Sequence, residues 1–79
     1  VGQYTGLHDK NGREIYEGDI VLCTMPFESF NAVVEFADGC FEIRSKKWRD
    51  YLKVYVANHA VEIIGNRWDN PELLKEGSV

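Results

Sequence analysis

The chain has 79 residues, of which 44% are hydrophobic and 28% are charged, and its formal net charge is -4 at pH 7. This balance is typical of one small globular domain and excludes a disordered polyelectrolyte. No apolar run approaches the roughly 20 residues that a membrane-spanning helix needs, and the amino terminus lacks a signal pattern, so we expect a cytoplasmic protein.

Two turns open the chain. The first contains Asn11-Gly12, the dipeptide favoured by tight type I′ hairpin turns, and the second contains Glu17-Gly18, where glycine tolerates a positive φ. Alternating residues then predict a strand over 19–24. Met25-Pro26 ends this strand because proline cannot donate a hydrogen bond to a sheet ladder.

The middle of the chain predicts a β-hairpin. Asp38-Gly39 stands between two alternating runs, 31–37 and 40–45, and an Asp-Gly pair in that setting is a strong signal for a two-residue turn. A charged connection over 46–50 follows the hairpin.

Two more strands are predicted in the last third of the chain. They cover 51–57 and 60–65 and are joined by a turn at Asn58-His59. The composition of 52–64 also allows a helix. Strands are favoured because Val, Tyr and Ile dominate this segment and its apolar residues recur at a spacing of two.

Five short strands with tight turns predict a mainly β fold, a small five-stranded SH3-like β-barrel with a short C-terminal helical turn. Asp69 or Asn70 would cap that turn, with Pro71 at its first position. Closure of the sheet would remove exposed strand edges, and residues 1–79 would form a single small β domain. The residues expected to face the core are Ile20, Leu22, Val34, Phe36, Phe41, Ile43, Val54, Val56 and Ile63.

Basic residues concentrate in the segment 44–53, which carries a local charge of +4, whereas the rest of the chain carries -8. Basic side chains in this segment would neutralise phosphates, and Trp48 would stack on an unpaired base. The alternative is a solvated loop with Trp48 folded back onto the barrel, which the short footprint on an acidic chain favours. The candidate binding residues are Arg44, Lys46, Lys47, Trp48, Arg49 and Tyr55.

Two histidines and two cysteines are the other candidates for chemistry. Structural zinc sites usually bring their ligands in close pairs, whereas these four residues occur singly, so we expect free thiols, no metal and no cofactor. No motif places a nucleophile beside a base, and no glycine-rich phosphate loop is present, so we expect no enzyme. The four residues are His8, Cys23, Cys40 and His59, and both cysteines fall on the outward faces of their strands.

Aromatic and apolar side chains exceed what one small core can hold. We therefore expect a non-enzymatic protein that acts through protein-protein contacts or self-association, with nucleic-acid binding by the 44–53 segment as the alternative. Neither a membrane nor a small-molecule substrate is expected. A plainer interpretation is that two or three of these side chains cap the barrel ends. The surplus comprises Met25, Phe27, Phe30, Trp48, Tyr55 and Trp68.

Two blocks of the sequence are distinctive, one near each end: Gln3 to Leu7, Asp9 to Gly12 and Glu14 to Val21, and then Val61 to Asn66 and Asp69 to Leu74. Together they resemble the YopX-like proteins of bacteriophages and prophages. The resemblance implies a β-rich fold and a phage or prophage origin, in a bacterial host cell, and it implies no activity or catalytic residues. Members usually carry an additional N-terminal region, so it also implies that this chain is the C-terminal portion of a longer protein.

Overall fold

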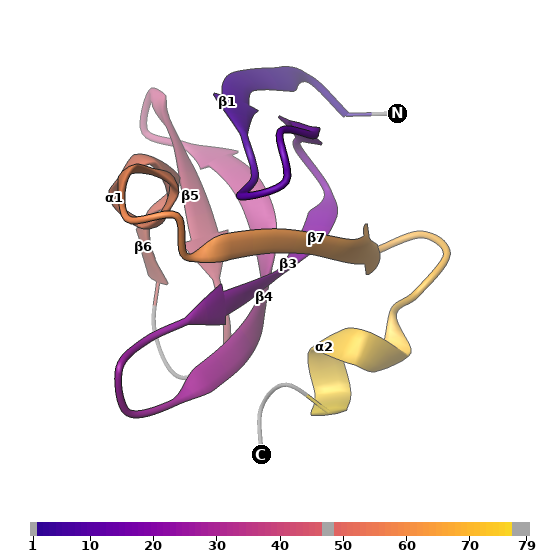
Figure 1. Cartoon of the computed structure of the whole chain (residues 1–79). Helices are drawn as coiled ribbons and strands as arrows, with labels where there is room; N and C mark the ends of the chain where they lie inside the picture. Colours follow the sequence, from indigo (N-terminus) through magenta and orange to yellow (C-terminus); the bar gives the residue numbers. More distant parts are fainter. Residues whose placement is uncertain (1, 47–48, 77–79) are drawn as a thin grey trace.

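The structure, a computed structural model, describes residues 2–46 and 49–76 and is mainly β (Figure 1). It contains a five-stranded antiparallel sheet, a separate two-stranded hairpin and two short helices. Neither helix in this described part is long and apolar enough to cross a membrane. In chain order the elements are β1 (Tyr4–His8), β2 (Glu14–Tyr16), β3 (Asp19–Thr24), β4 (Ser29–Ala37), β5 (Cys40–Arg44), β6 (Arg49–Tyr51), α1 (Leu52–Ala57), β7 (Val61–Asn66) and α2 (Glu72–Glu76).

The strands of the large sheet lie in the order β6-β5-β4-β3-β7, and β1 pairs with β2 outside it. The predicted mainly β class is therefore confirmed. Strands β6 and β7 form the two edges of the sheet, and no ladder among the described strands joins them.

The predicted hairpin at Asp38-Gly39 is confirmed. Strands β4 and β5 pair around it, with Ala37 opposite Cys40. Both turn residues have positive φ values, 53° for Asp38 and 80° for Gly39. A type I′ turn requires this of both central residues, and Asp-Gly adopts it at low cost.

The first turn differs from its predicted type. Residues 9–13 connect β1 to β2, and the backbone N–H of Gly12 donates to the carbonyl of Asp9 at 3.0 Å. Of the Asn11-Gly12 pair, only Gly12 has a positive φ, so the turn is not type I′. The side chain of Asp9 organises the backbone here instead, by accepting hydrogen bonds from the N–H groups of Asn11 and Arg13.

The predicted strand over 51–57 is wrong, because residues 52–57 form helix α1. Leu52 and Tyr55, one helical turn apart, are its buried residues, whereas Val54 is exposed. His59 ends the helix in the left-handed region with φ of 55°, and the N–H of Ala60 donates back to the carbonyl of Tyr55 at 2.9 Å. The turn at Asn58-His59 is confirmed, and the short helix α2 is present as predicted after Pro71.

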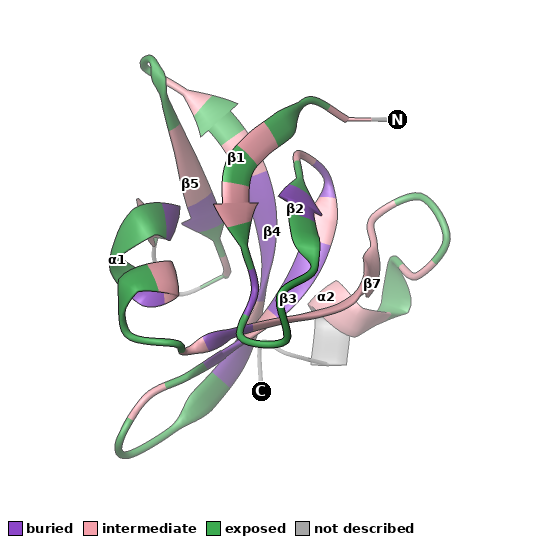
Figure 2. Cartoon of the chain, turned by 45° about the horizontal axis from the view of Figure 1, so that its top comes forward, coloured by how far each residue is buried: buried purple, intermediate pink, exposed green. Residues whose placement is uncertain are grey.

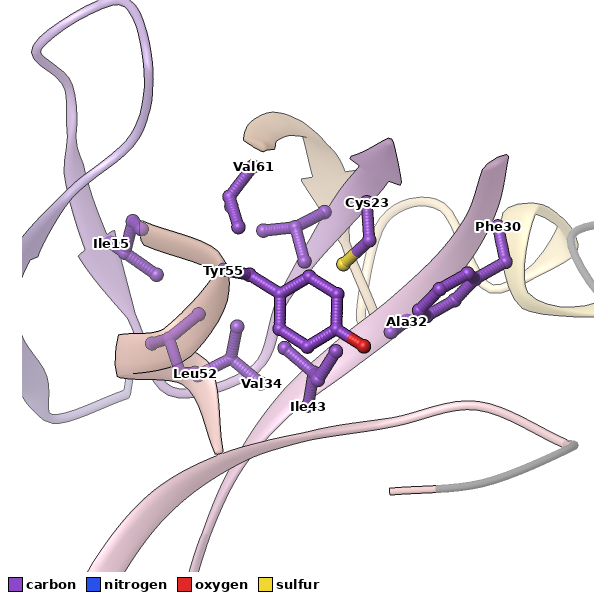
Figure 3. Packing of buried hydrophobic residues seen from close by; sticks show 10 residues of the cluster. Ile15, Cys23, Phe30, Ala32, Val34, Ile43, Leu52, Tyr55 and Val61 are labelled. Carbon is purple, nitrogen blue, oxygen red and sulfur yellow. The ribbon is translucent and has the colours of Figure 1, made fainter. Parts of the chain in front are cut away.

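The core lies between the large sheet, the β1–β2 hairpin and α1 (Figures 2 and 3). Strand β3 contributes Val21 and Cys23 to it, so the face predicted for this strand is wrong. Ile20 is buried on the other face of the sheet, directly opposite Val33 of β4. The core cluster consists of Ile15, Val21, Cys23, Phe30, Ala32, Val34, Ile43, Leu52, Tyr55 and Val61.

Other predicted core positions divide into three groups. Val34 and Ile43 are confirmed as buried, and Phe36 and Val54 are exposed, which corrects the prediction for both. The remaining positions are partly buried, and they are Leu22, Phe41, Val56 and Ile63. Phe36 shares a face with the buried Val34 but lies at the hairpin end of β4, near the turn at Asp38-Gly39. Val54 lies in α1, where the helical period turns it away from the buried Leu52 and Tyr55.

Candidate functional site

A groove between the β3–β4 loop and helix α1 is the candidate site for binding a partner. Its volume is about 680 Å³. Phe27, the residue that follows Pro26 of the groove wall, is 99% exposed. We call this feature the Phe27 groove. It is lined by Thr24, Met25, Pro26, Asp50, Val54, Tyr55, Asn58, His59 and Ala60.

Backbone hydrogen bonds hold the two walls of the Phe27 groove in place. The N–H of Met25 donates to the carbonyl of Glu28 at 2.8 Å, which closes the loop and leaves Pro26 and Phe27 at its tip. The N–H of Thr24 donates to the carbonyl of Ala60 at 2.9 Å, so the loop is fastened next to the end of α1. Phe27 is therefore exposed at the tip of a turn whose backbone is fixed by hydrogen bonds.

Tyr55 links the Phe27 groove to the core. Its ring is buried and meets the ring of Phe30 edge-on at 6.1 Å between centroids (Figure 3). Tyr55 is one of the candidate binding residues predicted from the sequence, and the structure buries its side chain in the core. Phe30 is likewise a core residue, whereas Phe27 and Trp68 of the aromatic surplus are exposed and Met25 is partly buried.

Two arginines of the predicted basic segment lie opposite each other on the sheet, Arg44 on β5 and Arg49 on β6. Each pairs with a glutamate. Arg44 donates two hydrogen bonds to Glu35, from Nε at 2.8 Å and from Nη2 at 2.7 Å, and Arg49 lies 3.7 Å from a carboxylate oxygen of Glu42. Lys46 is exposed, and Lys47 and Trp48 lie outside the described residues.

Glu35 also forms an ion pair with Arg67, a residue that we did not predict from the sequence. The guanidinium of Arg67, just beyond β7, lies 3.5 Å from the same Glu35 oxygen that Arg44 contacts. The hydrogen bonds from Arg44 and the nearby charges of Arg67 and Arg49 hold the pKa of Glu35 below its ordinary value, although burial opposes this. The sequence signal was the dipeptide Arg67-Trp68 directly after the last strand.

The cysteines and histidines do not form a common centre. Both thiols are free, Cys23 in the core and Cys40 on the surface, so the predicted outward position is wrong for Cys23 and confirmed for Cys40. Burial raises the pKa of the Cys23 thiol to about 12, so its thiolate is even less populated than that of an ordinary cysteine. Within 2–46 and 49–76, no three His, Cys, Asp or Glu residues gather as metal ligands.

Comparison with known proteins gives one family. The family model described as YopX protein matches residues 1–75, which extends over every strand and reaches into α2. No curated protein matches the chain. The match covers nearly the whole sequence, including the segment between the two blocks that carry the resemblance. The chain belongs to the YopX protein family.

Proposed function

We propose that this protein is a non-enzymatic phage or prophage accessory protein that associates with itself through the Phe27 groove. The observation that carries the proposal is the almost complete exposure of Phe27 on a braced loop beside a groove with several apolar lining residues. A large aromatic side chain left in water at such a position is typical of an interaction surface.

A second copy is the occupant that the arrangement favours. A two-fold interface uses the same surface on both partners, so a projecting side chain next to a hollow allows each copy to insert into the other. Phe27 and its groove meet this requirement on one face of the molecule. Burying one phenylalanine side chain contributes roughly 1.5–3 kcal/mol, and a reciprocal exchange would bury two.

We also propose the chemical role, the cellular location and the fold type of the protein. The burial of Cys23, which raises the pKa of its thiol, fits a role in which this thiol does not act as a nucleophile. We further propose a cytoplasmic location in a bacterial host, and we interpret the antiparallel five-stranded sheet as an open relative of an SH3-like barrel.

Light-scattering mass over a concentration series tests self-association. We expect the wild-type mass to rise from monomer towards dimer, and Phe27→Ser to remain monomeric because the exchanged ring is lost. Phe36→Ser is the matched control, since Phe36 is also an exposed phenylalanine but lies on β4 away from the groove lining. A wild type that is monomeric at every concentration would contradict the proposal, as would equal loss of association in both variants.

A further inference from the structure

We propose that the protein has a second binding surface, independent of the Phe27 groove, that binds single-stranded nucleic acid. We call it the arginine strip. It consists of Arg44, Arg49 and Arg67, with the ring of Trp68 beside Arg67. The sequence indicated only the 44–53 part of this surface, whereas the fold adds Arg67 and Trp68 to it.

One carboxylate gathers arginines from three separate segments. Glu35 on β4 contacts Arg44 of β5 and Arg67 beyond β7, and the charge of Arg49 on β6 also acts on it. The guanidinium groups are thereby held near one another before any ligand arrives. Because the side chains are already ordered, less conformational entropy is lost when a ligand binds them.

The strip presents positive charge outward. The side chains of Arg44, Arg49 and Arg67 are 47%, 55% and 37% exposed, whereas those of Glu35 and Glu42 are only 23% and 13% exposed. The acids therefore lie beneath the guanidinium groups. Arg44 uses Nε and Nη2 on Glu35, and its other N–H groups remain for phosphate oxygens.

The arginine strip has a net positive formal charge. With Lys46, which lies beside Arg44, the strip has four basic side chains against the carboxylates of Glu35 and Glu42, for a net charge of +2. All other residues of the chain together carry -6. A polyanion would therefore approach this face and be repelled elsewhere.

The exposed aromatic ring of Trp68 stands beside the arginines. The Arg67 guanidinium lies 5.1 Å from the ring centroid of Trp68. A Cβ on Gly18 would collide with that indole, so one edge of the ring is packed on backbone while about half of Trp68 stays exposed.

The combination favours single strands over duplex. Aromatic side chains stack on unpaired bases, and a double helix keeps its bases stacked on one another. Basic side chains alone would suit either form, because both carry phosphates. The exposed part of the Trp68 ring is thus the feature that selects the single strand.

Fluorescence anisotropy with a labelled oligothymidylate of about 15 nucleotides tests this inference at about 50 mM and about 200 mM salt. We expect Arg67→Ala to weaken binding at least about fivefold and to reduce the slope of log affinity against log salt by about 0.7, because one phosphate contact is lost. We expect Trp68→Leu to weaken binding by a similar factor with an unchanged slope, because stacking releases no counterions.

Arg13→Ala is the matched control, since Arg13 is an exposed arginine that lines a different part of the surface. It should change the affinity by less than about twofold. Three outcomes would overturn the inference: no binding by the wild type at the lower salt concentration, equal weakening by Arg13→Ala and Arg67→Ala, or equally tight binding of a duplex of the same length. Phe27→Ser should retain oligonucleotide binding, so failure of one proposal is separable from failure of the other.

Discussion

Asp9 shows how one side chain can join two parts of this fold. Among the described residues it is the only polar or charged one that is buried. Its Oδ1 accepts hydrogen bonds from the N–H groups of Asn11 and Arg13, both at 2.9 Å, and its Oδ2 accepts one from Ile63 of β7 at 3.1 Å. Lys10 adds a backbone hydrogen bond to Val61 at 2.9 Å. Asp9 thus fastens the first turn over part of the β7 edge.

The protonation of Asp9 links this contact to pH. Burial raises its pKa, but the N–H groups of Ile63, Arg13 and Asn11 together outweigh that effect, so the pKa lies below the ordinary 3.8. A carboxyl group with a lower pKa in the folded state stabilises the fold above its unfolded-state pKa. That stabilisation is lost as the pH falls through the folded-state pKa.

We predict that Asp9→Asn lowers the free energy of unfolding by about 2 kcal/mol at neutral pH, because an amide cannot accept all three hydrogen bonds. Below about pH 4, the free energy of unfolding should fall less in the variant than in the wild type. Urea unfolding at several pH values measures both effects. Asp38→Asn, at an exposed turn position that suits asparagine, should change little. Parallel stability curves for wild type and Asp9→Asn would contradict the assignment.

At the scale of elements, α1 is a short helix made from residues with high strand propensity. Its apolar positions Leu52, Val54 and Val56 fit a spacing of two, yet Leu52 and Tyr55 are the residues that meet the core. The helix packs against β5, β6 and β1, so its buried face covers one end of the core. Tertiary packing has overridden local preference here.

Substitutions in α1 distinguish the helical phase from the strand phase. We predict that Leu52→Ala lowers the free energy of unfolding by about 3 kcal/mol, because it leaves a cavity at a fully buried position. Val54→Ala should cost less than about 0.5 kcal/mol, because Val54 is exposed. Chemical denaturation of both variants measures the difference. A strand over 51–57 would make the two costs similar, which would contradict the helix.

At the scale of the whole molecule, a single sheet carries apolar contacts on both faces. The main core includes residues of β2 and α1 on one face. On the other face α2 lies against β4, where the side-chain Nδ2 of Asn31 donates to the carbonyl of Leu73 at 2.9 Å. The two buried layers meet in strands β3 and β4, so these strands should open only when the whole domain unfolds.

Thiol labelling measures that global opening. We predict that native protein reacts rapidly at Cys40 alone and that Cys23 reacts only in step with unfolding, because Cys23 is fully buried in β3. Urea should therefore raise the count of reactive thiols from one to two per chain. In Cys40→Ser, the native protein should show almost no fast reaction. Rapid labelling of Cys23 in the native state would contradict the buried position of β3.

Residues close together in the sequence determined the turns. Asp38-Gly39 specifies its hairpin because both residues tolerate positive φ, and Gly18, with φ of 93°, holds the turn before β3 for the same reason. The mainly β class followed from alternation between such turns. The basic character of 44–53 was also visible, and Arg44 and Arg49 do lie together on the sheet.

Only the tertiary structure decided which faces are buried and which distant residues meet. Alternation does not distinguish Val21 from Ile20 when both faces of β3 are covered, and it misassigned α1 because six residues are too few to separate the two periods. The contact between Glu35 and Arg67 joins segments 32 positions apart in the sequence, and sheet pairing alone brings them together. Local sequence therefore determined where this chain turns, whereas long-range packing determined the core, the Phe27 groove and the full arginine strip.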